Sequence, residues 1–505
     1  MPHEWSHVGS WIERHARERP DRLAVIDAER SLDYASLHER ILRCVAVLSA
    51  RGVGRGDRVA LLLKNRSAYL EVIFATARLG AIALPLNARL TAPELRPLLE
   101  DADPQLLIHE RTLADAVERA AGRLVKLACG GHPDAYERAL AEATPQGGLH
   151  PVTPEDAMIL MYTSGTTGTP KGALLPHRKT LYNSLNAEIF FGLRADDRVL
   201  VVLPLFHSFG LLILALPTLF AGGTVELHSH FDAVELWRSV EANRVDFFGG
   251  VPVMFQALLG ALDEPPARDF DKSSLRFLFT AGAAIPVDVI RGFERHGLVL
   301  KQGFGQTETS ILCCLDAGDA LRKAGSVGRP VHHAEVRIVA TDGIEGPTED
   351  WRDVGVGEKG EIVVRGPISM LGYWNRPEAT AETLRGEWLR TGDLATADDE
   401  GFLTLVGRAR HMYISGGENV YPSEVEAVFL EHPDVAEVAI VGVPDERWGE
   451  SGEAHVVPVS AATLDPDTLL AWARERLAPF KLPRRFHLRE ALPRTATGKI
   501  QKHRL

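Results

Sequence analysis

The sequence predicts an α/β protein with a large N-terminal domain of βα sheets that carries a β-rich subdomain, followed by a small mobile α+β C-terminal domain. Up to about residue 330, short β-rich runs alternate with amphipathic helical stretches, as expected for parallel sheets. Beyond it, strands separated by Gly-rich turns predict the subdomain. After Gly407 the chain starts again with a separate α/β unit.

Strands of the N-terminal part are predicted from short β-rich runs. Examples are Val59–Leu63, Leu106–Glu110, Asp246–Pro252 and Leu275–Ala284. The subdomain is predicted from EVRIVATDG, GEIVVRG and FLTLVGR, with a polar loop over residues 341–360.

The C-terminal unit has helix and strand signals of its own. Ser423 and Glu426 have the spacing of a capping box, and the helix after it would bury Val425, Val428 and Phe429. The run VAEVAIVGV then predicts a strand.

The restart of the pattern places a domain boundary near residue 408. We expect an N-terminal domain over residues 1–407, a hinge over 408–411, and a mobile C-terminal domain over 412–505.

Composition indicates a large enzyme rather than a nucleic-acid or membrane protein. The 505 residues include 45% hydrophobic ones, enough for more than one core. The net charge of -12 argues against nucleic acid as the main partner. The most hydrophobic stretch, 209–220, is about half the length of a bilayer span and contains Pro217, so no membrane span is expected.

Cysteine usage and the N-terminus bear on the compartment. The four cysteines form no C-x-x-C pair and show no zinc-ligand spacing, which favours a reducing compartment and no structural metal. The N-terminal residues mix both charge signs without an apolar core, unlike a signal peptide. These features predict a cytoplasmic protein. The oligomeric state, a homodimer included, is left open.

The stretch MYTSGTTGTPKGALLPH is the most informative segment. Between Thr163 and Gly172 it combines glycines, hydroxyl side chains and Lys171, which together suit the wrapping of phosphate. It is not a Walker A motif, because Pro170 stands where that motif requires glycine. An apolar run enters it, which distinguishes it from an ordinary surface loop. We interpret it as a nucleotide-triphosphate loop.

Three further clusters suit nucleotide chemistry. In GFGQTET, Phe304 could stack on a purine and the Glu308 carboxylate could bind Mg²⁺. In WLRTGD, Asp393 follows a predicted glycine turn and could accept hydrogen bonds from a ribose diol. The C-terminal stretch from Lys481 holds eight Lys/Arg and one Glu, and TATGK places Lys499 on a Thr/Gly turn that could present it to an anion.

In this order, the segments resemble the adenylate-forming superfamily of acyl- and aryl-CoA synthetases, luciferases and nonribosomal adenylation domains. Within it, NARLTAPEL, LRKAGSVGRP and YWNRPEAT look most like bacterial fatty-acyl- and aryl-CoA ligases. The matching motifs are TSGTTGTPKG, LPLFH, GFGQTE, GEIVVRGPISMLGYW, WLRTGD, GR, SGGENVYPSEVE and PRTATGK.

The resemblance implies a two-step ligation in which ATP converts a carboxylate to acyl-AMP, and CoA then displaces AMP. It makes Lys499, His207, Thr307 and Glu308 the catalytic residues, with Glu308 as the Mg²⁺ ligand and His207 beside the acyl carboxylate. The implied ATP-binding residues are Thr163, Ser164, Gly165, Thr166, Thr167, Gly168, Lys171, Gly282, Ala283, Ala284, Phe304, Gly305, Thr307, Asp393, Arg408 and Lys499.

The resemblance also implies an acceptor tunnel and a hinge. Glycines would leave room for a narrow thiol. The tunnel and CoA-nucleotide residues are Arg89, Gly416, Gly417, Trp448, Phe480 and Lys481, and the hinge residue is Arg410. His411 and Tyr413 depart from the family pattern, in which an acidic residue and an Ile are usual.

The acyl pocket implied by the resemblance is apolar apart from His207. It would consist of His207, Phe209, Ile213, Phe248, Gly250, Ala281, Ala283, Gly305, Ile311 and Leu312. Because no Arg or Lys occurs among them, a dicarboxylate such as malonate is disfavoured. A hydrophobic monocarboxylic acid is expected, either a medium to long chain or a ring-bearing acid.

Three functions stay open at this point. The first is an acyl-CoA ligase. The second is an ATP-dependent amide ligase that passes the acyl group to an amine or amino acid, which the altered hinge segment would permit. The third, a non-catalytic acyl-nucleotide binding protein, is disfavoured by the intact Lys499, Glu308 and phosphate loop.

Overall fold

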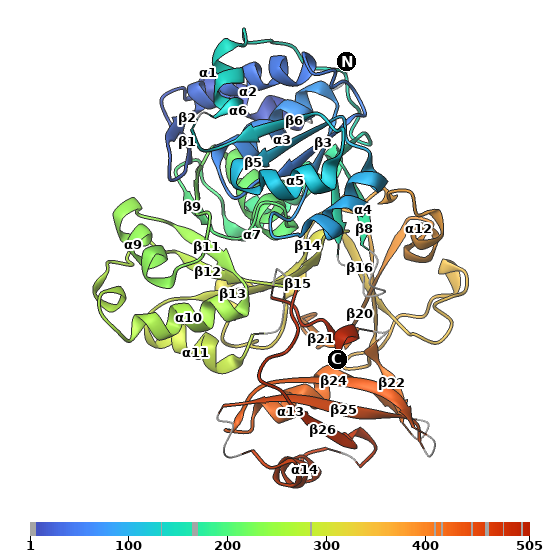
Figure 1. Cartoon of the computed structure of the whole chain (residues 1–505). Helices are drawn as coiled ribbons and strands as arrows, with labels where there is room; N and C mark the ends of the chain where they lie inside the picture. Colours follow the sequence, from blue (N-terminus) through green and yellow to red (C-terminus); the bar gives the residue numbers. More distant parts are fainter. Residues whose placement is uncertain are drawn as a thin grey trace. The chain divides into compact units, whose positions relative to one another are not determined.

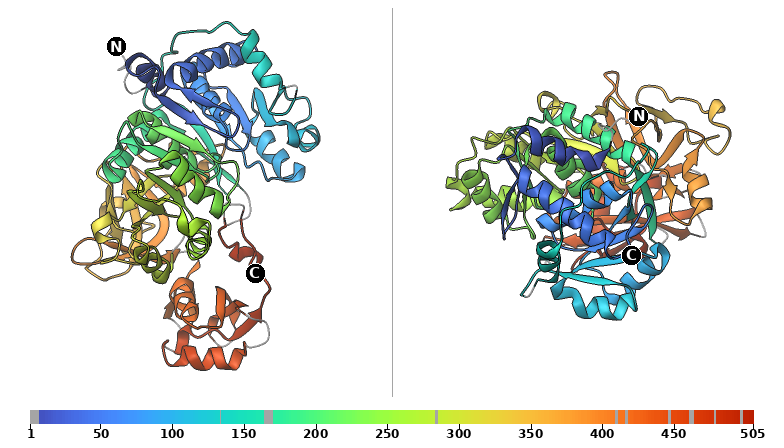
Figure 2. Two further views of the ribbon diagram at one scale, coloured as in Figure 1. Left: turned by 90° about the vertical axis from the view of Figure 1, so that its left-hand side faces the viewer. Right: turned by 90° about the horizontal axis from the view of Figure 1, so that it is seen from above.

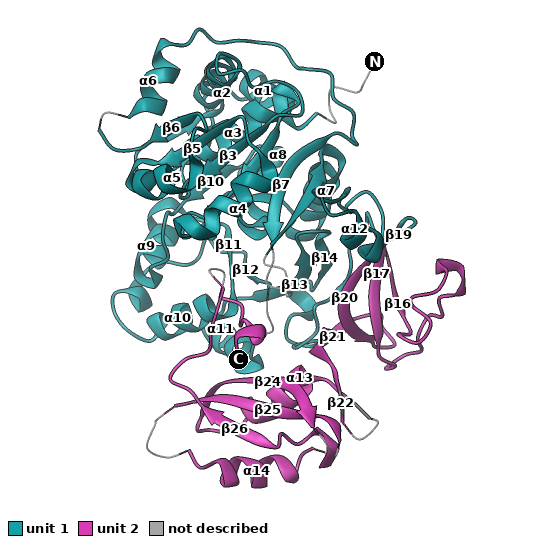
Figure 3. Cartoon of the chain, turned by 45° about the vertical axis from the view of Figure 1, so that its right-hand side comes forward, with its two compact units in different colours: residues 1–163, 170–335, 365–387 teal, residues 164–169, 336–364, 388–505 magenta. Residues whose placement is uncertain are grey.

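The structure is a computed structural model that describes residues 7–132, 134–163, 170–282, 285–408, 411–415, 418–445, 448–459, 464–477, 479–495 and 498–505. It divides into two compact units (Figure 3). Unit 1 comprises residues 1–163, 170–335 and 365–387. Described residues of unit 2 fall within 336–364 and 388–505, so the β-rich subdomain groups with the C-terminal part of the chain. The expected boundary at residues 408–411 stays a prediction.

The first sheet of unit 1 is parallel in its centre and antiparallel at both ends. Its order, among the described strands, is β15 (Arg329–Pro330), β14 (Ser310–Cys314), β13 (Leu300–Gln306), β12 (Phe277–Thr280), β11 (Phe247–Gly250), β9 (Arg198–Val201), β10 (Thr224–Leu227), β1 (Leu23–Ile26) and β2 (Ser31–Asp33).

The second sheet of unit 1 has a parallel centre and one antiparallel end. Its order is β18 (Gly372–Tyr373), β8 (Lys171–Pro176), β7 (Ala157–Thr163), β4 (Ile82–Pro85), β3 (Arg58–Leu62), β5 (Leu106–Glu110) and β6 (Lys126–Cys129). The parallel βα sheets predicted from the sequence are confirmed.

Helices cover these sheets (Figure 1; Figure 2). The N-terminal ones are η2 (Val8–Ser10), α1 (Trp11–Glu18), α2 (Tyr34–Ser49), α3 (Ser67–Leu79), α4 (Ala92–Ala102), η3 (Arg111–Leu113), α5 (Ala114–Ala121), α6 (Ala135–Glu142) and α7 (His177–Phe191). The later ones are η4 (Phe209–Ala215), α8 (Leu216–Ala221), α9 (Ala233–Asn243), α10 (Pro252–Leu262), η5 (Ala267–Asp269), α11 (Val287–Arg295), η6 (Ala317–Asp319) and α12 (Pro377–Thr383), after which β19 (Leu384–Arg385) follows.

Successive side chains of β11 pack against helices on opposite faces of the first sheet. Phe247 contacts Phe191 of α7, with ring centroids 5.2 Å apart. The next residue, Phe248, packs against Trp237 of α9 and Phe255 of α10. Because successive strand residues point to opposite faces, this buried phenylalanine pair places α7 on one face and α9 and α10 on the other.

Unit 2 contains the strands of the predicted subdomain and a separate C-terminal sheet. The first group is β16 (Glu335–Val339), η7 (Thr348–Asp350), β17 (Gly360–Arg365), β20 (Trp388–Ala397) and β21 (Leu403–Arg408). The second is β22 (Tyr413–Ser415), β23 (Glu418–Val420), α13 (Pro422–Leu430), β24 (Val435–Asp445), β25 (Gly449–Pro458), α14 (Pro466–Arg474), η9 (Pro479–Lys481), β26 (Arg485–Leu488) and η10 (Lys502–Arg504).

The C-terminal sheet buries one face against its helices. Val425 and Phe429 of α13 and Leu469 of α14 share a core with Ile440 and Ala454 of the sheet. The order is β23-β22-β25-β24, with β26 parallel to β25. The predicted α+β unit is confirmed.

The predicted capping box of α13 is wrong. The helix begins at Pro422, whose ring suits the first helical position. Ser423 therefore lies one residue inside the helix, and its hydroxyl donates to the carbonyl of Val406. The Glu426 carboxylate accepts from the backbone N–H of Ile440 at 2.7 Å.

The structure also shows the state of the four cysteines and whether any helix could span a membrane. Cys44, Cys129, Cys313 and Cys314 are all buried free thiols, so no disulfide links them. In the part of the chain that the structure describes, no helix has both the length and the apolar character needed to cross a bilayer.

Candidate functional site

The predicted phosphate loop connects two antiparallel strands, β7 and β8. Thr163 ends β7 and pairs in register with Lys171, the first residue of β8. The Thr163 hydroxyl donates to the Lys171 carbonyl at 3.3 Å. The strand pair therefore fixes both ends of the loop. Its interior, which contains Ser164, Gly165, Thr166, Thr167 and Gly168, lies outside the described residues.

A second antiparallel hairpin, β13–β14, carries Phe304, Thr307 and Glu308. A side chain at Gly305 would collide with the carbonyl of Ser310 across the hairpin, so only glycine permits this close approach. Ser310 adopts a positive φ of 61°, which is uncommon for a residue with a side chain. The tight turn buries Thr307 and leaves Phe304 and Glu308 half-buried.

Tyr373 of β18 links the two hairpins. Its hydroxyl donates to Glu308 Oε1 at 2.8 Å, and Lys171 Nζ lies 5.3 Å from the centre of its ring, within the range of a cation–π contact. The backbone N–H of Met370 also donates to the Glu308 carbonyl at 2.9 Å. Tyr373 was not predicted as a site residue, although it stands in the family motif GEIVVRGPISMLGYW.

Helix α7 holds the turn that carries Glu308. Lys179 is 1% exposed and its ammonium donates to the Ser310 hydroxyl. One turn later, Asn183 accepts from the Ile311 N–H at 3.1 Å. Burial lowers the pKa of Lys179 to about 7, against a smaller opposing effect of the Glu308 charge. Neither residue was selected from the sequence, because both pair with partners more than a hundred positions away.

The same helix also holds the segment that carries Tyr373. Arg178 Nη1 donates to the carbonyls of Pro367 and Ser369 at 2.7 and 2.9 Å. One helix therefore fixes both partners of the Tyr373–Glu308 hydrogen bond.

His207 precedes η4, a π-helical segment, and is half-buried. Its Nδ1 accepts from the backbone N–H of Phe209 at 3.4 Å, which places the proton of a neutral ring on Nε2. The loop before it is tied down by buried Asn65, which donates to the Leu203 carbonyl at 2.9 Å and accepts from the Leu205 N–H at 2.9 Å. Asn65 was not predicted as a positioning residue.

Several predicted acyl-pocket residues lie on neighbouring elements. Phe209 and Ile213 lie on η4, and Ile311 and Leu312 on β14; all four are buried. The Phe209 ring contacts Phe279 with centroids 5.5 Å apart. Since η4 and β14 are in contact, these four residues form an apolar wall, which we call the η4 wall.

Strand β11 places its two glycines on different faces. A Cβ at Gly249 would lie 3.0 Å from both Phe209 and Leu214 of η4. A Cβ at Gly250 would instead meet Phe255 of α10 at 3.2 Å. Gly249, which was not among the predicted pocket residues, therefore faces the η4 wall. The predicted Phe248 packs on the other face, against α9 and α10.

The segment after β12 contains four of the remaining predicted residues, and Arg89 lies between β4 and α4. Ala281 is buried, and Gly282 has a positive φ of 90°. Ala283 and Ala284 lie outside the described residues. Arg89 is exposed and its N–H donates to Asn87.

In unit 2, Asp393 and Arg408 pair with each other. They stand opposite in the β20–β21 register, with Arg408 Nε 2.9 Å from Asp393 Oδ1. Gly392 is not in a turn, as the sequence predicted, but inside β20, where the pairing with β17 shifts. Its φ of 68° and the shifted register indicate a β-bulge, which reorients the side chain that follows.

The turn predicted for Lys499 is confirmed. The Thr495 N–H donates to the Lys499 carbonyl at 2.7 Å, and the Gly498 N–H to the Thr495 carbonyl at 2.9 Å. Gly498 has a φ of 83°, and the Lys499 N–H donates to the Thr495 hydroxyl. The hairpin turn thus fixes the backbone from which the Lys499 side chain extends.

Three of the predicted CoA residues, Trp448, Phe480 and Lys481, belong to unit 2. The Arg484 guanidinium stacks on the Trp448 ring at 5.1 Å. Lys481 forms an ion pair with Glu424, and Phe480 packs against the C-terminal core. Arg484 was not predicted. Arg410, Gly416 and Gly417 lie outside the described residues.

Comparisons with known proteins match most of the chain. The family described as AMP-binding enzyme matches residues 12–374, and the one described as AMP-binding enzyme C-terminal domain matches residues 424–499. The chain is 44% identical to a feruloyl-CoA synthase of Amycolatopsis over 98% of this chain and 97% of that protein. It is 42% identical to an indoleacetate–CoA ligase of Aromatoleum aromaticum, over 98% and 96%.

A solved structure gives the same fold. The O-succinylbenzoate coenzyme A synthetase of Bacillus subtilis in complex with ATP and magnesium ion matches with a TM-score of 0.86 and 30% identity, over 98% of this chain and 99% of that one. The two family matches span most of both units, and in them the phosphate-loop, GFGQTE and PRTATGK motifs keep their order. The chain therefore belongs to the AMP-binding enzyme family, the adenylate-forming superfamily that its motifs indicated.

Proposed function

We propose that this protein is an AMP-forming ligase that activates a ring-bearing hydrophobic monocarboxylic acid with ATP and transfers it to CoA. The observation that carries the proposal is the 44% identity to a feruloyl-CoA synthase across nearly the whole length of both chains. The indoleacetate–CoA ligase adds a second relative named for an acid with an aromatic ring.

In the first step, a carboxylate oxygen attacks the α-phosphorus of ATP, the bond to the β-phosphate oxygen breaks, and pyrophosphate leaves. Negative charge accumulates on the phosphate oxygens, so fixed cations and N–H donors lower the barrier. We assign the β- and γ-phosphates to the loop between Thr163 and Lys171, and the bridging of carboxylate and phosphate to Lys499. Thr307 would contact the α-phosphate.

Glu308 fits a Mg²⁺ ion. It offers a hard carboxylate oxygen on a turn held by Tyr373 and α7, and Mg²⁺ in nucleotide sites commonly binds one or two carboxylates together with phosphate oxygens and water. When bound, the ion supplies charge neutralisation to the phosphates. The chain's own residues keep the carboxylate in place for it.

We assign the nucleoside to Phe304, Gly305 and the segment after β12, and the ribose hydroxyls to Asp393 and Arg408. The Asp393–Arg408 pair supports this role, because the guanidinium holds the carboxylate in place and its oxygens can accept from a diol.

In the second step, the CoA thiol attacks the acyl carbonyl carbon, a C–S bond forms, and the C–O bond to AMP breaks. Gly416 and Gly417 would form the thiol tunnel. Arg89, Trp448, Phe480 and Lys481 would bind the nucleotide end of CoA, and we add Arg484 because it stacks on Trp448. Arg410 would be the hinge between a domain of residues 1–407 and one of residues 412–505.

The acid would lie against the η4 wall, with His207 at its carboxylate. The walls formed by Phe209, Ile213, Ile311 and Leu312 carry no charge, which suits a neutral ring and disfavours a second carboxylate. Because Gly249 has no side chain, Phe209 and Leu214 of η4 pack directly against β11. We infer that the ring of the acid lies against the Phe209 side of this wall.

One experiment tests the substrate and the acceptor together. The purified chain is incubated with Mg²⁺, ATP and a panel of ferulic acid, indoleacetic acid, a dicarboxylic acid and fatty acids of increasing length, with CoA or an amino acid as acceptor. We expect AMP release with the ring-bearing acids and thioester formation with CoA. Amide formation without CoA would instead establish the amide ligase that the Arg410-His411 segment left open.

A further inference from the structure

A cluster of metal-ligating side chains lies on the C-terminal sheet, on β25 and β26. Glu453 and His455 are two residues apart on β25 and therefore share a face. His487 of β26 stands opposite His455 in the parallel register. The intervening Ala454 belongs to the core under α13 and α14, so the cluster is on the sheet face away from these helices.

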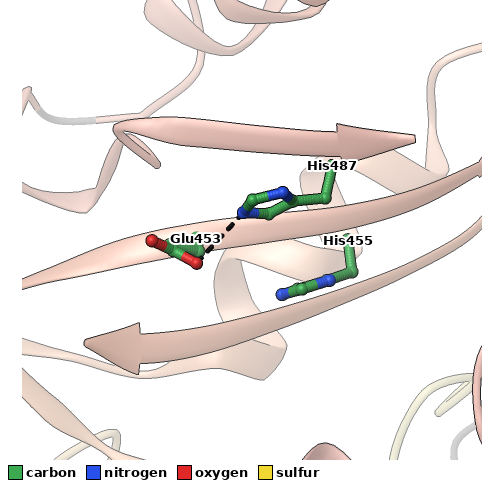
Figure 4. Close-up of side chains that lie close together, drawn as sticks. All are labelled: Glu453, His455 and His487. Carbon is green, nitrogen blue, oxygen red and sulfur yellow. Dashed lines mark hydrogen bonds and ion pairs between the residues drawn. The ribbon is translucent and has the colours of Figure 1, made fainter. Parts of the chain in front are cut away.

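The donor atoms of the cluster converge. One ligand atom from each of Glu453, His455 and His487 lies within 4.8 Å of the other two. His487 Nε2 is 3.0 Å from Glu453 Oε2, and the two imidazoles stack with centroids 4.7 Å apart. Figure 4 shows both rings with their outer nitrogens toward the same side as the carboxylate.

His455 gives an independent indication that something binds here. The residue is only 2% exposed, and its Nε2 is buried without a hydrogen-bond partner within the described part of the chain. A buried imidazole nitrogen normally has a partner.

We propose that Glu453, His455 and His487 form a binding site for a divalent transition-metal ion of the Zn²⁺ class, separate from the Mg²⁺ expected at Glu308. Two imidazole nitrogens and one carboxylate oxygen are a ligand set that suits Zn²⁺ and leaves one position of a tetrahedron for water. Mg²⁺ prefers an all-oxygen ligand set, so we expect Mg²⁺ at Glu308 and the transition-metal ion at the cluster.

Two exposed arginines compete with the ion. Arg485 Nη1 donates to Glu453 Oε1 at 2.7 Å, and Arg489 donates to His455 Nδ1 at 3.3 Å. The latter bond requires the proton of neutral His455 on Nε2. Metal binding at Nε2 moves that proton to Nδ1, where it faces the Arg489 donor, so Arg489 must turn into water. Because both arginines are exposed, they can be released at small cost.

This competition gives a specific test. The full chain is stripped with EDTA and titrated with ZnCl₂ by calorimetry, without nucleotide and with Mg²⁺ present to occupy oxygen-only sites. We expect one Zn²⁺ at the cluster, and His487→Gln and Glu453→Gln should each weaken its affinity by about tenfold or more, as loss of metal-site groups does. Arg489→Gln removes the competing donor and should strengthen the affinity.

His230→Gln is the matched control, because His230 is an exposed histidine of unit 1 far from the cluster in sequence. It should bind Zn²⁺ as the wild type does. The gain expected for Arg489→Gln keeps the test decisive even if a ligand variant folds poorly, which circular dichroism without metal would show. The proposal is overturned if the wild type binds no Zn²⁺, or if His487→Gln and Glu453→Gln bind it as tightly as the wild type.

Discussion

The Tyr373 hydroxyl donates a hydrogen bond of 2.8 Å to Glu308 Oε1, and it joins a short strand near the end of unit 1 to the turn of the β13–β14 hairpin. Lys171 lies over the same aromatic ring. The tyrosine therefore stands between the residue that we assign to the phosphates and the one that we assign to Mg²⁺.

Tyr373→Phe should raise the Mg²⁺ concentration needed for half-maximal pyrophosphate release by about 10- to 100-fold, since groups that orient a metal ligand have effects of this size. The ring and its contact with Lys171 remain. Tyr182→Phe, a tyrosine of α7 that contacts His333, is the control and should leave the Mg²⁺ dependence unchanged. An unchanged Mg²⁺ dependence in Tyr373→Phe would show that Tyr373 does not position Glu308 for Mg²⁺.

Lys179 should make the stability of the protein depend on pH. Burial lowers its pKa from 10.5 to about 7, so between these values the unfolded chain binds a proton that the folded chain does not. The contribution of Lys179 to the free energy of unfolding therefore rises with pH from about 7 to 10. In Lys179→Met that contribution is absent. The wild-type free energy of unfolding minus that of Lys179→Met should increase over this range in urea titrations, and a constant difference would contradict the buried-lysine argument.

Lys499→Ala should slow adenylation by about 10² to 10³, because removing a fixed donor opposite a developing anion costs on the order of 3 to 4 kcal/mol. Transfer from preformed acyl-AMP to CoA should be much less affected. Lys502→Ala is the matched control, since Lys502 pairs with Glu426 in the same basic segment. Single-turnover assays of each half-reaction measure the effect, and an equal loss in both would refute the assigned role.

Gly249→Val and Gly250→Val should separate the two faces of β11. Valine at Gly249 would crowd Phe209 and should raise the KM of a ring-bearing acid by roughly tenfold, with a smaller effect on short acids, as overpacking by about 1 to 3 kcal/mol implies. Valine at Gly250 would crowd Phe255 instead, and should lower thermal stability rather than change acid selectivity. If acid selectivity changes only in Gly250→Val, then Gly250, as predicted from the sequence, faces the acid and Gly249 does not.

The parts of the site that were predicted from sequence are those with local signals. The phosphate loop, the Glu308 turn and the Lys499 turn each lie within about ten residues, and glycine with hydroxyl residues encodes such turns directly. The alternation of β and α patterns likewise predicted the parallel sheets.

The missed features depend on partners that are distant in sequence. Tyr373 meets Glu308 across 65 positions and Lys179 meets Ser310 across 131, so no local pattern reveals either contact. Gly249 was missed because the period of two in a strand fixes which residues share a face but not which face meets the acid.

Two local interpretations failed because a neighbouring residue decided the geometry. Pro422 starts α13 one residue before the expected capping box. Gly392 forms a bulge inside β20 rather than a turn, since β17 continues to pair on both sides of it.

The most direct test of the central claim is the identity of the products from ATP and a ring-bearing acid. In the absence of CoA, the purified chain should catalyse exchange of labelled pyrophosphate into ATP, and the exchange should depend on the acid. With CoA present, mass spectrometry should find AMP and the acyl-CoA thioester in equal amounts. Formation of ADP, or acid-dependent AMP release with no thioester when CoA is supplied, would contradict the account.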